Sequence, residues 1–171
     1  MCRAMRIPLI LFACIVAAPA LAATKANPPA GPAPKELGRF NRWIAAEYAQ
    51  GGHTVCYAFT RAGLEDPATG NGPVLSVTDR PGSRDQVAIS SGPAFPKDFT
   101  LPVQVGSANL DFYTSGHDAF ARDSKATVAA MLPASTAVAH MPGLKGGSAM
   151  TFSLDGFTAA HDAVGKACPA H

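Results

Sequence analysis

The sequence has almost no net charge and, past its first residues, no long apolar stretch. Fourteen Lys and Arg side chains oppose twelve Asp and Glu, and two of the fourteen, Arg3 and Arg6, lie in an N-terminal leader, so the rest is balanced. A neutral surface argues against nucleic acid and against electrostatic docking on a membrane. After the leader, no segment approaches the ~20 apolar residues of a membrane-spanning helix, so we expect no membrane span.

The short motifs of common enzyme families are also missing. The sequence contains no G-x-S-x-G, H-E-x-x-H, Walker or G-x-G-x-x-G pattern. It has no C-x-x-C pair, so two cysteines could not complete a tetrahedral thiolate zinc site. We therefore expect no enzymatic activity, no cofactor and no metal.

Residues 1–22 have the pattern of a signal peptide. Arg3 and Arg6 form a positive start, residues 7–18 are apolar, and Ala20-Leu21-Ala22 is a small-x-small cleavage signal. We expect export and cleavage after Ala22.

A linker and one domain are expected to follow the signal. Residues 23–36 hold four prolines among small residues, which favours an extended linker. Residues 37–171 have the length of a single domain with an ordinary core.

Removal of the signal takes Cys2 and Cys14 away and leaves Cys56 and Cys168. Two cysteines in an exported protein predict one disulfide. A closed loop of ~100 residues would stabilise the fold by roughly 4–5 kcal/mol in the chain-entropy model. Two free buried thiols are the alternative.

Alternating patterns separated by Gly, Pro and Asp predict many short strands. We expect strands at residues 43–48, 53–60, 74–78, 86–90, 99–105, 110–114, 136–141 and 151–154, and helices at 123–132 and 155–168. This favours a mainly β fold, an antiparallel β-sandwich or barrel-like domain with two short peripheral helices, one of them C-terminal.

The strand at residues 53–60 makes a prediction about its two faces. If Val55, Tyr57 and Phe59 face a sheet–sheet core, then Cys56 faces the opposite side. A terminal helix carrying Cys168 would then cover that outer face.

The terminal helix is expected to begin at a capping Asp155 and to end at Pro169. The side chains at helical spacing on one of its faces are Phe157, Ala160, His161, Val164 and Cys168.

The densest charge cluster surrounds Pro81-Gly82 and consists of Asp79, Arg80, Arg84 and Asp85. A solvated hairpin turn with ion pairs of under ~1 kcal/mol each is the preferred interpretation. The alternative is a recognition loop, because loops on rigid sheets often carry function.

Among the histidines, His140 lies in a predicted strand and His161 on the predicted helix face. His161 could be a ligand or a base, but a semi-buried packing role is favoured. A metal site would need several histidines and carboxylates to converge, and no spacing in the sequence requires that.

Several short segments, in order, resemble the invasion-associated locus B (IalB) family. They are V-C-Y at 55–57, V-T-D-R-P at 77–81, L-D-F-Y at 110–113, S-L-D-G-F-T-A-A at 153–160 and K-A-C-P at 166–169. The resemblance covers residues 40–169. It implies an exported protein of alphaproteobacterial type, associated with the periplasm or outer envelope, and linked in pathogenic members to host-cell invasion.

Two hypotheses about function follow. The favoured one is a non-enzymatic protein, periplasmic, outer-envelope associated or secreted, that binds an unidentified protein or envelope component. It predicts an exposed apolar or mixed patch. The alternative is a small periplasmic enzyme or metal-binding protein, which predicts a pocket holding His140 or His161 with a carboxylate.

Overall fold

The structure is a computed structural model that describes residues 33–63, 67–68, 70–141 and 148–169. The predicted signal peptide, residues 1–22, and nearly all of the predicted linker lie outside these residues. Both therefore stay predictions.

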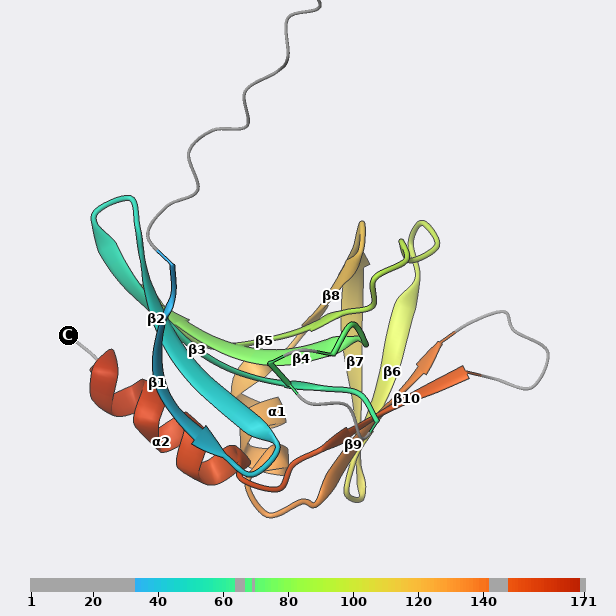
Figure 1. The fold of residues 1–171 in the computed structure, drawn as a ribbon. Coiled ribbons are helices and arrows are strands. Elements are labelled where there is room, and N and C mark those ends of the chain that lie inside the picture. Colours follow the sequence, from blue (N-terminus) through green and yellow to red (C-terminus); the bar gives the residue numbers. More distant parts are fainter. Residues whose placement is uncertain (1–32, 64–66, 69, 142–147, 170–171) are drawn as a thin grey trace, which may run out of the picture. The chain divides into compact units, whose positions relative to one another are not determined.

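The described residues contain ten strands in one antiparallel sheet, in the order β1-β2-β3-β4-β5-β8-β7-β6-β9-β10 (Figure 1). The strands are β1 (Lys35–Phe40), β2 (Trp43–Gln50), β3 (His53–Arg61), β4 (Val74–Arg80), β5 (Ser83–Ser90), β6 (Thr100–Val105), β7 (Ala108–Ser115), β8 (Asp118–Ala121), β9 (Thr136–Met141) and β10 (Ser148–Ser153). The helices of the described part are α1 (Ser124–Met131) and α2 (Phe157–Ala167). The predicted fold class, mainly β and antiparallel with two short helices, is confirmed.

The sheet bends strongly but does not close. Near one end of β3, Ala62 forms an isolated antiparallel bridge with Phe152 of β10, and the Gly63 amide donates to the Thr151 carbonyl at 2.9 Å. The segment that follows the internal strand β3 therefore meets the edge strand β10 of the other half of the sheet, which makes the domain barrel-like.

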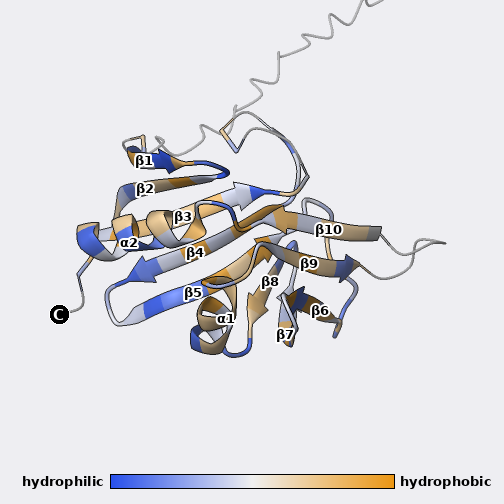
Figure 2. Ribbon diagram, turned by 90° about the horizontal axis from the view of Figure 1, so that it is seen from below, coloured by the Kyte–Doolittle hydropathy of each residue, from blue (hydrophilic) through white to orange (hydrophobic). Residues whose placement is uncertain are grey.

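Both helices lie on the same side of β3–β5, as Figure 2 shows from below, and they pack on the apolar inner face of the sheet. The largest fully buried side chains include Trp43, Phe112, Phe152, Phe157, Leu75, Ile89, Leu101 and Met131. These residues come from both halves of the sheet and from both helices, so one core unites the domain. No described helix is long and apolar enough to cross a membrane.

The predicted orientation of β3 is wrong for its two rings. Val55 is buried as expected, but Cys56 and Ala58 are fully buried as well, whereas Tyr57 and Phe59 are only half-buried on the opposite face. The small side chains face inward because α2 packs closely against them, and bulky rings there would hold the helix away. The terminal helix does cover the Cys56 face, as expected, but that face belongs to the core.

The predicted Asp155 cap of α2 is also wrong. The N-cap is Gly156, with φ of 90°, and no side chain caps the helix. The Asp155 carboxylate instead accepts from Asn41 Nδ2 at 2.8 Å, and the Asp155 carbonyl accepts from the Arg42 amide. Asp155 thus joins the β1–β2 turn to the start of α2.

Other boundaries differ slightly from the prediction. Neither β1 nor the short β8 was among the predicted strands, and β1 begins at Lys35, two residues before the expected domain start. α1 is capped by Asp123, the first residue of the range expected for this helix, whose carboxylate accepts from the Ala126 amide at 2.9 Å.

Candidate functional site

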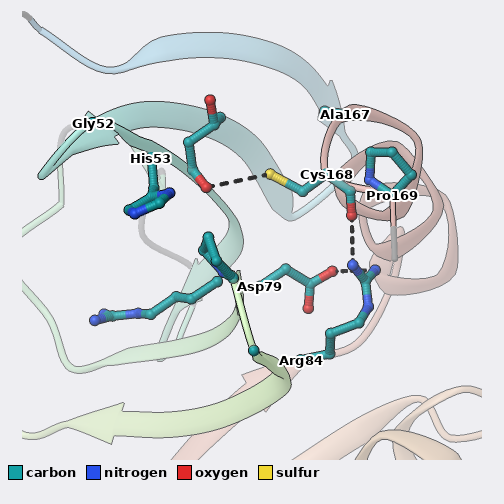
Figure 3. A pocket seen from close by; sticks show the side chains of 11 residues that line it. Gly52, His53, Asp79, Arg84, Ala167, Cys168 and Pro169 are labelled. Atoms are coloured by element: carbon teal, nitrogen blue, oxygen red, sulfur yellow. Dashed lines mark hydrogen bonds and ion pairs between the residues drawn. The ribbon is translucent and has the colours of Figure 1, made fainter. Parts of the chain in front are cut away.

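A cavity of about 600 Å³ opens where the β2–β3 turn, the β4–β5 turn and the end of α2 come together (Figure 3). Gly52 and His53 line one side, and Cys168 and Pro169 line another. Asp79, Arg80, Pro81, Gly82 and Arg84 come from the hairpin. The cavity therefore joins the predicted charge cluster to the predicted disulfide.

The structure contains the expected disulfide between Cys56 and Cys168, with Cα atoms 6.0 Å apart. The Cys168 sulfur also lies 3.9 Å from the Thr54 carbonyl oxygen (Figure 3). That approach is a packing contact, because a disulfide sulfur carries no proton to donate. The bond fastens the end of α2 to β3 at the rim of the cavity.

The buried carboxylate of Asp79 organises the hairpin. Its side chain is only 2% exposed and forms an ion pair with Arg84, while its other oxygen accepts from the Asp85 amide at 2.8 Å. Arg84 also donates to the Cys168 carbonyl. One guanidinium thus connects the hairpin to the end of α2, beside the disulfide.

A β-bulge explains why Arg84 and Asp85, which are neighbours on β5, both contact α2 or its end. Thr78 pairs with Gln86 and Arg80 with Ser83, so Asp79 alone opposes Arg84 and Asp85. Asp85 adopts φ of 56°, a left-handed conformation that Asp tolerates better than most residues.

The charge cluster is therefore only partly what the sequence predicted. Asp79 is buried rather than solvated, and Arg84 holds α2 against the sheet. Arg80 is exposed, and among the described residues it forms no ion pair. The recognition loop stays a prediction, with Arg80 as its available charge.

We expect Asp79→Ala to lower the free energy of unfolding by roughly 2–4 kcal/mol. The change leaves the Asp85 amide without its hydrogen-bond acceptor and removes the carboxylate that pairs with Arg84. Urea unfolding measures this, with Arg80→Ala as the matched control, because removal of an exposed side chain should cost under about 0.5 kcal/mol. Equal losses in the two variants would show that the buried carboxylate does not organise the hairpin.

The opposite face of the sheet carries a second depression, here called the aromatic groove, of about 380 Å³. Its lining residues are Tyr48, Tyr57, Phe59, Arg61, Val74, Ser76, Thr78 and Arg80, from β2, β3 and β4. Tyr48 meets Tyr57 edge-on with ring centroids 5.7 Å apart, and Tyr57 stacks on Phe59 at 5.9 Å. Three rings in series thus form one wall.

The side chains of the two arginines in the groove differ in how firmly other residues hold them. Arg61 is fixed by its donation to the carbonyls of Pro67 and Gly72 at 3.0 and 2.9 Å. Arg80 lines both the groove and the cavity behind it, so this residue marks the point where the two depressions meet.

The same face carries aromatic residues beyond the groove. Strand pairing places Phe59, Ser76, Ala88 and Phe120 in one cross-strand row, and Phe120 stacks on Tyr113 at 5.4 Å. Tyr113 is 46% exposed and does not line the groove. It is a matched comparison residue for the groove tyrosines.

Burial raises the pKa of Tyr57 above its ordinary value of 10.0, and the nearby Tyr48 phenol adds to the rise. The folded state therefore holds this proton more tightly than the unfolded state. The associated stability is fully present below pH 10 and is lost as pH rises through the folded pKa. We expect Tyr57→Phe to lose less stability than the wild type between neutral and strongly alkaline pH, as measured by urea unfolding. Parallel curves would contradict this.

The two candidate histidines lie apart in the fold. His140 is exposed on β9, whereas His161 on α2 contacts Asp85 Oδ1 at 2.8 Å and packs on Phe157. His161 thus has the semi-buried packing role that was favoured, together with a carboxylate partner. Neither histidine lines the cavity or the groove, and no three described His, Cys, Asp or Glu side chains gather as metal ligands.

The sequence alone did not indicate the groove. Its signal was present in the alternation of β3, where Tyr57 and Phe59 share a face, but those rings were assigned to the core. Only the pairing of β2, β3 and β4 brings Tyr48 and Thr78 beside them.

Comparison with known proteins gives a match in structure only. No family model and no curated protein matches the chain. The crystal structure of invasion associated protein B from Bartonella henselae matches with a TM-score of 0.58 and 18% sequence identity, over 74% of this chain and 92% of that chain. The resemblance inferred from the ordered sequence motifs is thus confirmed in the fold, which is similar to that of invasion associated protein B.

Proposed function

We propose that this protein is an exported, non-enzymatic envelope protein of the invasion-associated locus B type, which binds another protein or envelope component through the aromatic groove. The observation that carries the proposal is the half-buried wall of Tyr48, Tyr57 and Phe59 on the solvent face of the sheet. Aromatic side chains supply large contact area at little entropic cost, which is why binding surfaces are rich in them.

The chemistry of the groove supports binding rather than catalysis. Its described lining consists of aromatic, aliphatic, hydroxyl and guanidinium groups, without a carboxylate or an imidazole. General acid–base catalysis near neutral pH usually relies on those missing groups. The disulfide supports a periplasmic, outer-envelope or secreted location, because such bonds persist in oxidising compartments.

The test is capture of partners from an envelope extract by the oxidised protein, with mass spectrometry and a metal assay on the same sample. Wild type is compared with Tyr48→Ala, Tyr57→Ala and Tyr113→Ala. We expect a partner that is lost with both groove variants and kept with Tyr113→Ala. Capture that does not depend on the groove tyrosines would refute the proposed surface. Stoichiometric metal without a partner would favour the alternative that uses His140 or His161.

A further inference from the structure

We infer that the aromatic groove binds an extended proline-rich segment of a partner protein, with an acidic residue of that segment against Arg80. The inference rests on the proposed function and names the class of partner.

The first argument is the arrangement of the rings. Tyr48, Tyr57 and Phe59 follow one another at 5.7 and 5.9 Å between centroids, along one wall of a shallow groove. Rigid aromatic walls of this kind pack against the flat pyrrolidine rings of a polyproline II helix, which is ordered before it binds and loses little entropy.

The second argument is hydrogen-bond complementarity. A proline-rich segment offers exposed carbonyl acceptors and few N–H donors, because proline has none. The groove offers donors in the hydroxyls of Tyr48, Tyr57 and Thr78 and in the Arg80 guanidinium. The fourth hydroxyl of the lining, on Ser76, already donates to the Ala88 carbonyl at 3.4 Å.

The same chemistry disfavours a saccharide. Sugar hydroxyls donate as well as accept, so their recognition needs strong acceptors as well as aromatic faces. The part of the lining that the structure describes contains no carboxylate or amide side chain. The hydroxyl oxygens of Tyr48, Tyr57 and Thr78 can accept, but they are weaker acceptors than carboxylates, so a sugar is matched less well in this groove than a chain of carbonyls.

Strand addition is also disfavoured. The strands β3 and β4 are internal, because β3 pairs with both β2 and β4, and β4 pairs with β5 on its other side. Their backbone groups are used within the sheet, so a ligand on this face is recognised by side chains alone. Side-chain recognition is the mode of polyproline binding, not of β-augmentation.

The arginines of the site predict where the acidic residue of the ligand binds. Arg84 is engaged by Asp79 and Arg61 by two backbone carbonyls, which leaves Arg80 exposed at the junction of groove and cavity. Arg80 forms no ion pair among the described residues. A carboxylate of the ligand could therefore form an ion pair with its guanidinium.

The probe is a capped peptide of Ala-Pro-Pro repeats that ends in Asp, titrated into the oxidised protein by calorimetry. Matched peptides carry Ser in place of Pro, or Asn in place of Asp, and an N-acetylglucosamine oligomer represents the saccharide class. We expect the Pro peptide to bind and the Ser peptide and the oligomer not to bind.

Variants then locate the contact. Tyr48→Ala and Tyr57→Ala should weaken binding about tenfold or more, and Tyr57→Phe roughly fivefold through one lost hydrogen bond. Arg80→Ala should weaken the Asp peptide roughly fivefold but not the Asn peptide. Tyr113→Ala should bind like wild type. Melting temperatures show which variants remain folded, and Tyr57→Phe and Arg80→Ala keep the test valid if the alanine variants unfold.

Equal binding of the Ser peptide, unchanged binding in the groove variants, or binding of the oligomer instead of the peptide would each overturn the inference. Capture from extract that still depends on Tyr48 and Tyr57 would then leave the proposed function standing. Loss of that dependence would refute both.

Discussion

Gly156→Ala should lower the free energy of unfolding by about 3–5 kcal/mol. Gly156 adopts φ of 90°, a region that residues with a Cβ rarely occupy. A Cβ there would lie 2.0 Å from the Phe40 carbonyl oxygen, which is rigid backbone of the β1–β2 hairpin. The start of α2 would have to move away from the sheet. Urea unfolding monitored by the fluorescence of Trp43, which packs on Phe157 at 4.9 Å, measures the loss.

The same helix provides the control. Gly165 has a helical conformation, and a Cβ there would meet only Arg84 Nη2 at 3.8 Å, an ordinary contact. Glycine within a helix costs about 1 kcal/mol relative to alanine, so Gly165→Ala should leave stability unchanged or increase it. Similar losses for both alanines would mean that the close approach to Phe40 is unimportant.

Cys168→Ser should lower the free energy of unfolding of the oxidised protein by roughly 4–5 kcal/mol. The bond joins residues 112 positions apart, and closure of so long a loop removes much entropy from the unfolded chain. For a domain of this size the melting temperature should fall by roughly 10–20 °C. Calorimetry under oxidising conditions is the measurement.

Reduction supplies the comparison for this variant. Wild type treated with a reductant should melt close to Cys168→Ser, and the reductant should not alter the variant. If oxidised wild type and variant melt together, the bond does not stabilise the domain.

Local patterns predicted most elements of the fold but not their packing. The alternation of residues 53–60 correctly predicts a strand. Hydrophobicity alone then places Tyr57 and Phe59 inside, whereas the structure buries Cys56 and Ala58 because α2 needs close approach. The strand β8 was missed because it has only four residues and no flanking pattern of its own.

The candidate site was less predictable, since it depends on contacts between distant segments. Asp155 has the properties of a helix cap, but the N-cap is the next residue, Gly156, which has φ of 90° and lies too close to the Phe40 carbonyl to carry a side chain. Likewise, the bulge opposite Asp79 depends on strand register, and that register converts apparent surface charges into a buried pair. No short sequence window contains this information.

The position of the disulfide has a consequence for the order of maturation. Cys56 lies on the third strand, and its partner follows the last described helix, so seven strands separate the two sulfurs along the chain. During synthesis from the N-terminus, Cys56 must persist as a thiol until Cys168 emerges. Within residues 33–169 it has no other cysteine to pair with, so no incorrect intrachain bond can form there. We expect oxidation to follow sheet formation and to lock a finished domain rather than direct its folding.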